Sequence, residues 1–188
     1  MKISSLFLVL IASTASFNSY ANRVAPWNKS PQLEELIVNL KKQYSMENQS
    51  ELRKQNLSEV DNLSYFIRFI DKDGSPEQAK LKAFLLGTQI AYSRGVYQQM
   101  QTNVIPWFCP KGGYLETRTY SGNPTLFIEN LIYEAMEKDI KLDPTSFTRS
   151  NGIGAFSPTN SFIMYGLQTK YPCYDTVPEA HRLNGFFY

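Results

Sequence analysis

Histidine and cysteine are scarce in this chain. Its 188 residues include one histidine, His181, and two cysteines, Cys109 and Cys173. A structural zinc site needs about four ligands at characteristic spacings, which this set does not supply. A cysteine hydrolase needs a histidine base, and the pair Cys109 and His181 is the one such dyad that the sequence offers. We therefore expect a protein that is not an enzyme and that holds no metal or cofactor.

An excess of charge of one sign is also absent. The full chain has 19 Lys and Arg against 17 Asp and Glu, and the two signs are interspersed. Binding to nucleic acid or to a membrane surface as a main role requires a concentrated basic field. This composition argues against both roles.

Long hydrophobic runs are confined to the N-terminus. Lys2 is followed by the apolar run Leu6 to Ala12, and Ser19 to Ala21 has the small-x-small pattern of a signal peptidase site. These three parts predict a cleaved signal peptide over residues 1–21. The apolar run is far shorter than the roughly 20 residues of a spanning helix. We therefore expect export to an oxidising compartment, without membrane insertion after cleavage.

A calcium loop is suggested by the stretch that begins at Asp71, since Asp71, Asp73 and Ser75 occupy alternating positions. The sixth position of such a loop requires glycine and the twelfth a bidentate glutamate. Here these positions hold Pro76 and Lys82. The pattern therefore favours a helix cap over a calcium site.

Prolines mark where helices begin. In Ser30-Pro31, Ser75-Pro76, Asn123-Pro124 and Ser157-Pro158, a capping side chain directly precedes a proline, which is the arrangement typical of a helix start. Apolar residues at three- and four-residue steps follow each pair. A further helix is expected from Ser58, with Gly74 as its left-handed C-terminal cap. The pattern predicts helices over 31 to about 46, 58–73, 76 to about 100, 124–136 and 158–171.

The predicted fold class is all-α, a single compact helical bundle of about five helices with one disulfide. Alternation of polar and apolar residues is weak, and only residues 112–122 suggest a short hairpin. Beyond the signal peptide, we divide the chain into an N-terminal helical extension, 22–72, and a disulfide-stapled helical domain, 73–188.

The two cysteines are expected to pair. Each lies in an aromatic- and proline-rich stretch at a helix end, Cys109 in "VIPWFCPKGGY" and Cys173 in "KYPCYD". A Cys109–Cys173 disulfide would close a loop of about 64 residues, for which chain entropy alone gives roughly 4 kcal/mol of stabilisation. In an oxidising compartment this outcome is far commoner than a free catalytic thiol.

Four stretches together carry a resemblance to a known family. They are "AYSRGV" at 91–96, "IPWFCPKGG" at 105–113, the helix "PTLFIENLIYEAM" at 124–136 and "GLQTKYPC" at 166–173. In their order and spacing they resemble the Rap/Tai group, the periplasmic immunity proteins of type VI secretion systems. That family has an exported helical domain with a Gly-Val step in its first core helix, a Phe-Cys element after it, and a Pro-Cys that closes its last helix. Residues 22 to about 72 have no counterpart in the pattern.

The resemblance implies a non-catalytic inhibitor that binds a secreted peptidoglycan amidase toxin and protects the producer and its siblings. Homodimer formation is a further implication of the same resemblance. The alternative is an exported helical envelope protein with a chaperone or accessory role and no toxin target. Capture of a single hydrolase would favour the inhibitor over the chaperone or accessory protein.

A candidate partner-binding segment lies between the last two predicted helices. The connection 143–158 is longer than the resemblance leads us to expect, and its centre is rich in glycine. Most such connections are mobile linkers. The alternative is that the segment projects into the groove of the target amidase. Its residues are Asn151, Gly152, Ile153, Gly154, Ala155 and Phe156.

Overall fold

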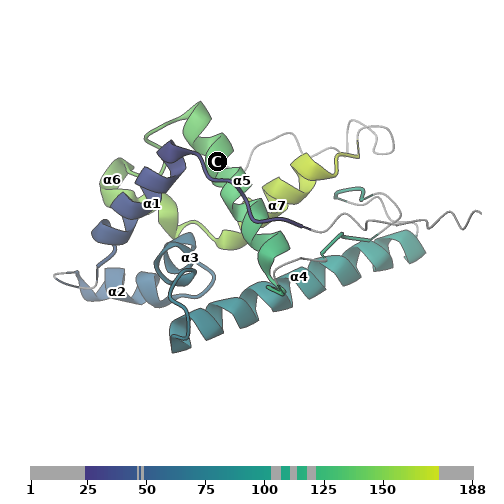
Figure 1. Cartoon of the computed structure of the whole chain (residues 1–188), viewed down its shortest axis with the longest axis horizontal. Coiled ribbons are helices and arrows are strands. Elements are labelled where there is room, and N and C mark those ends of the chain that lie inside the picture. The colour runs from purple at the N-terminus through teal and green to yellow at the C-terminus, as the bar shows by residue number, and fades with distance from the viewer. Residues whose placement is uncertain are drawn as a thin grey trace, which may run out of the picture.

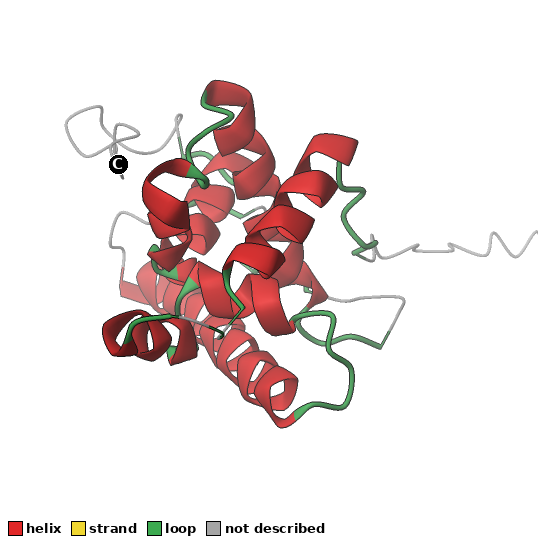
Figure 2. Cartoon of the chain, turned by 90° about the vertical axis from the view of Figure 1, so that its left-hand side faces the viewer, coloured by secondary structure: helices red, strands yellow, loops and turns green. Residues whose placement is uncertain are grey.

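The computed structural model describes residues 24–45, 47, 49–102, 107–110, 114–117 and 122–173. These residues form helices joined by loops and contain no strand (Figure 2), which confirms the predicted all-α fold class. The helices are α1 (Pro31–Gln43), α2 (Glu51–Ser58), α3 (Leu63–Phe69), α4 (Pro76–Thr102), α5 (Leu126–Leu142), α6 (Arg149–Gly152), the 3₁₀ turn η2 (Ile153–Phe156) and α7 (Thr159–Lys170).

Two of the proline-marked helix starts lie where the sequence predicts them. Ser30 caps α1, since its Oγ accepts a hydrogen bond from the Leu33 N–H at 3.2 Å, and Pro31 is the first helical residue. Ser75 caps α4 in the same way, accepting from the Gln78 N–H at 3.1 Å. Gly74 has the left-handed conformation, with a φ of +78°, but it does not cap the preceding helix, which ends at Phe69 with Ile70 as its C-cap. Gly74 instead lies in the turn before α4.

The other two starts come later than predicted. Asn123 accepts from the Thr125 N–H at 3.1 Å, so this segment forms a turn before α5 begins at Leu126. Pro158 pairs with Asn62 in an isolated antiparallel bridge, and α7 begins only at Thr159. The Asn123 turn is local, whereas Pro158 is held outside its helix by pairing with a distant part of the chain.

The predicted helix start at Ser58 is wrong. Ser58 ends α2, a helix that the sequence analysis did not predict, and the following helix α3 begins at Leu63. Ser50 caps α2, accepting from the Arg53 N–H at 3.3 Å. Only Leu57 of α2 is buried, so the helix carries almost no apolar periodicity.

Helix α5 lies at the centre of the molecule (Figure 1) and packs against α1, α4 and α7. Helix α3 contacts α1, α2, α4 and η2 on another side. Gly166 of α7 allows α5 and α7 to approach closely, because a Cβ there would lie 3.0 Å from the Leu131 Cβ. Helix α4 is the longest helix, and its C-terminal half extends away from α3 (Figure 1).

One hydrophobic core runs through the described residues. The predicted extension, 22–72, contributes to it together with α5 and α7, so the predicted division near residue 72 passes through packed side chains. The core residues with no exposed side chain include Leu33, Leu40, Tyr44, Leu57, Leu63, Phe66, Leu81, Leu85, Ile128, Ile132, Met136, Ile163 and Leu167.

The segment before α1 is bound across α5 by side-chain hydrogen bonds. The backbone N–H of Trp27 donates to Asn130 Oδ1 at 2.9 Å, and Asn130 Nδ2 donates to the Ala25 carbonyl at 2.6 Å. About two turns further along α5, the buried Glu137 accepts a hydrogen bond from the backbone N–H of Ser30 at 2.7 Å. These bonds fix α1 on the central helix.

Several predictions concern residues that lie wholly or partly outside the described part of the chain. The signal peptide, 1–21, and His181 fall outside it, as does most of the hairpin predicted over 112–122. Within the described residues, no helix has both the length and the apolar run that crossing a membrane requires.

Candidate functional site: a groove beside α4

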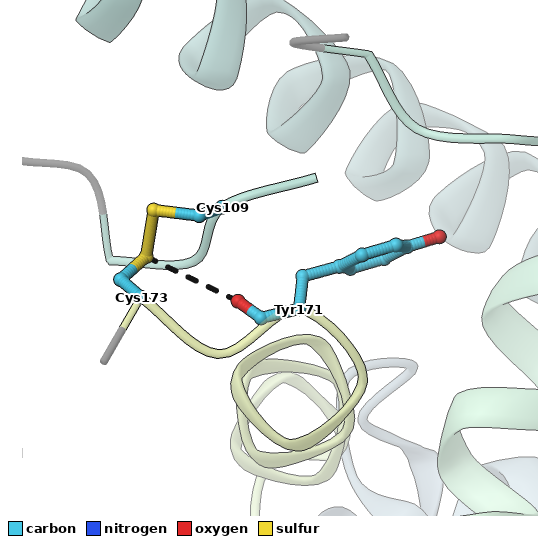
Figure 3. The surroundings of a disulfide bond; sticks show 3 residues. All are labelled: Cys109, Tyr171 and Cys173. Carbon is cyan, nitrogen blue, oxygen red and sulfur yellow. Dashed lines mark hydrogen bonds between the residues drawn. A yellow bond between two sulfur atoms is a disulfide. The ribbon is translucent and has the colours of Figure 1, made fainter. Parts of the chain in front are cut away.

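A disulfide joins the exit of α4 to the end of α7. Cys109 and Cys173 form the predicted bond, with their Cα atoms 5.1 Å apart (Figure 3). The Tyr171 carbonyl lies beside the bond and accepts from the Cys109 N–H at 2.7 Å. The covalent bond and this hydrogen bond together hold residues 107–110 against the end of α7.

The same segment also packs on α4. Phe108 is buried, and its ring contacts that of Tyr92 edge-on, with centroids 6.1 Å apart. Tyr92 in turn donates to Asn160 Oδ1 of α7 at 2.8 Å. Burial raises the pKa of Tyr92 to about 12, and the hydrogen bond between Tyr92 and Asn160 acts in the opposite direction. The Tyr92 phenol therefore stays protonated at neutral pH and links the two helices.

A groove of about 360 Å³ lies along the outer side of α4. Ile90, Arg94 and Tyr97 line it from one face of the helix, at four- and three-residue steps, and Thr117 lines it from the segment after the disulfide. Gln89 and Ser93 complete the lining. Helix α4 thus supplies most of the lining, and Thr117 contributes to it from outside the helix.

Two large apolar side chains that face solvent line this groove, Ile90 and Tyr97. Two more of the seven such side chains among the described residues, Trp107 and Tyr114, lie close to Cys109 in the sequence. Trp107 and Tyr114 flank the disulfide-bonded segment and are 55% and 64% exposed. Exposed aromatic residues are enriched on protein-binding surfaces.

A second groove, of about 510 Å³, lies between the end of α2, α3 and the start of α4. Its cations already make contacts within the chain. Arg68 donates to the Leu57 carbonyl at 2.8 Å and lies over the Phe69 ring, and Lys80 lies over the Tyr65 ring. The groove beside α4 is therefore the better candidate for a binding site.

The predicted partner-binding segment, Asn151 to Phe156, lies at the other end of the molecule, in α6 and η2 (Figure 1). It is folded onto α1 and α3 and is not an extended linker. Ala155 is fully buried, and the Tyr44 hydroxyl donates to the Gly152 carbonyl at 2.6 Å. Phe156 is half-buried against the Tyr44 ring. Contact of this segment with a partner stays a prediction.

The acidic residues of the rejected calcium loop serve the turn between α3 and α4. Asp71 pairs with Lys41 of α1 at 2.8 Å, and Asp73 accepts from Gln78 Nε2 at 2.8 Å. Among the residues that the structure describes, no group of three or more His, Cys, Asp or Glu side chains is placed to hold a metal ion.

Two matched glycine substitutions test how tightly the 151–156 segment is packed. A Cβ on Gly154 would lie 2.5 Å from the Ser146 carbonyl oxygen, whereas a Cβ on Gly87 of α4 would meet nothing within 4 Å. We expect Gly154→Ala to lower the free energy of unfolding by about 1 to 2 kcal/mol. Gly87→Ala is expected to raise it by about 0.5 to 1 kcal/mol, because alanine is the better helix former. Urea unfolding of both variants measures the difference, and equal effects would contradict the packing of η2.

Comparison of the chain with protein families, with characterised proteins and with solved structures finds no match.

The sequence analysis did not single out the groove residues Ile90, Arg94 and Tyr97. Their signal is present in the sequence, since they recur at helical spacing in residues 83–102, where Arg94 is the one charged residue.

Proposed function

We propose that this protein is a periplasmic immunity protein, which binds a peptidoglycan amidase effector of a type VI secretion system and covers its catalytic cleft. Such binding protects the producer and its siblings. The inhibitor acts by occupying the cleft, at one copy for each toxin, and performs no chemistry itself.

The position of the disulfide supports the proposal most directly. The Cys109–Cys173 bond joins "IPWFCPKGG" to "GLQTKYPC", two of the stretches that carry the resemblance, at the cysteines where that family has its disulfide. The predicted signal peptide and the exposed aromatic residues beside the bond fit the same role. A surface that is already rigid loses little conformational entropy on binding, which favours tight inhibition.

Inhibition in the secreted fraction of the producing organism tests this function. Oxidised mature chain, residues 22–188, is added in increasing amount while peptidoglycan hydrolysis is followed, and bound proteins are identified by mass spectrometry. We expect one amidase to be captured and its activity to fall to zero at an equimolar ratio.

Reduced and denatured chain is the control, and it is expected to leave hydrolysis unchanged. Failure to inhibit any cell-wall hydrolase would refute the immunity function. Weak binding to many unfolded proteins, without inhibition, would instead favour the chaperone or accessory role.

A further inference from the structure

Arg94 stands alone as a charge on the outer half of α4. From Ala83 to Thr102 the helix contains no other charged residue. Arg94 is exposed, lines the groove, and forms none of the ion pairs found among the described residues. A partner that covers Ile90 and Tyr97 would also remove water from this guanidinium, which is costly unless a carboxylate replaces the water.

One residue of the groove lining has a buried polar atom without a hydrogen-bond partner among the described residues. Gln89 is 7% exposed and lines the groove, and its Nε2 donates to the Pro124 carbonyl at 3.0 Å. Its Oε1 has no hydrogen-bond partner within the described residues. A buried oxygen of this kind favours an occupant that brings an N–H donor, which the backbone of a protein segment provides.

Next to the groove, α4 presents residues with short side chains or none. Ala83, Gly87 and Ala91 follow each other at four-residue steps and are all exposed. A Cβ on Gly87 would meet nothing within 4 Å, so packing within this chain does not require glycine there. Short side chains on this face let the backbone of another chain come close to α4.

A second copy of the same face does not satisfy Arg94. Two α4 helices that paired through residues 83–102 would bring two arginines together and offer neither a carboxylate, because this stretch contains no acid. The charge of the face is therefore complementary to a different protein.

We propose that the groove beside α4 receives a segment of a protein partner in which a carboxylate is flanked by apolar side chains. Arg94 pairs with the carboxylate, Ile90 and Tyr97 cover the apolar side chains, and Gln89 accepts from a backbone N–H. The identification of this partner with the amidase effector rests on the proposed function, whereas the chemistry of the groove does not.

Site-specific photo-crosslinking of the full chain in the producing cells tests the proposal. A photoreactive residue is placed at Ile90 or Tyr97 and, as controls, at Leu52 or Leu142, which are exposed apolar residues on other helices. We expect an adduct from positions 90 and 97 alone, with the crosslinked partner peptide containing Asp or Glu. Arg94→Glu is expected to reduce the adduct at least about tenfold, and Lys42→Glu, a charge reversal on α1, to leave it unchanged.

The outcomes separate this proposal from the proposed function. An Arg94-dependent adduct with a protein other than a cell-wall hydrolase would uphold the groove and refute the immunity function. A hydrolase adduct from the control positions and not from 90 or 97 would support the immunity function and refute the groove proposal. An adduct with a second copy of this chain, or none from positions 90 and 97, would overturn the groove proposal.

Discussion

Replacement of both Cys109 and Cys173 by serine is expected to lower the free energy of unfolding by about 4 kcal/mol. The two residues are 64 apart in the sequence, and the bond removes the freedom of that whole loop from the unfolded chain. Since small domains are stable by only about 5–15 kcal/mol, this loss is large. Urea unfolding of the oxidised wild type and of the double variant measures it.

The same variant is expected to keep its helices at room temperature. The buried core draws mainly on α1, α3, α4, α5 and α7 and includes neither cysteine. A reducing agent should bring the wild type to the stability of the double variant and should leave the double variant unchanged. A loss below about 1 kcal/mol would show that other contacts already hold residues 109 and 173 together.

The parts of the fold that the sequence predicts well are those decided by local chemistry. Ser30 and Ser75 cap their helices, and Gly74 takes the left-handed conformation, because each choice depends on a few neighbouring residues. The predicted pairing of Cys109 with Cys173 needed only the compartment and the number of cysteines.

The parts that the sequence did not predict depend on contacts between distant residues. Asn62 ends the turn before α3 by pairing with Pro158, which lies 96 positions later in the chain, and no local pattern shows this. Helix α2 buries only Leu57, so its apolar periodicity is too weak to detect. Gly154 seemed part of a loose connection, but the Ser146 carbonyl fills the space beside it.

The groove was missed because helical periodicity was used only to find the core. In α4 the inward positions Leu81, Leu85 and Val96 are buried as expected. The outward positions were not considered, although residues 83–102 carry a single charge. The low polarity of the outward face was the available signal for a binding surface. The position of Thr117 beside α4 was not predictable from the local sequence.

A buried ion pair between α4 and α5 carries the second large expected effect. Glu129 is 6% exposed and accepts hydrogen bonds from Lys82 of α4, from Asn123 Nδ2 at 3.0 Å and from Thr125 Oγ1 at 2.5 Å. Glu129→Ala leaves the Lys82 ammonium, whose side chain is 28% exposed, without its carboxylate. We expect the free energy of unfolding to fall by about 2 to 3 kcal/mol in urea.

Glu134→Ala on the same helix is the matched control. Glu134 pairs with Lys138 at 2.9 Å, one turn along α5 and nearer to solvent, so its loss is expected to cost only about 0.5 kcal/mol. Equal losses at Glu129 and Glu134 would contradict the difference in burial.

A double-mutant cycle assigns the effect of Glu129 to its partners. If the ion pair dominates, the coupling energy between Lys82→Ala and Glu129→Ala is at least about 1 kcal/mol, because each substitution removes the same interaction. A coupling energy near zero would mean that Glu129 acts through Asn123 and Thr125, which form the turn before α5. Its main role would then be to fix the start of the central helix, and α4 would be held on α5 chiefly by its apolar side chains.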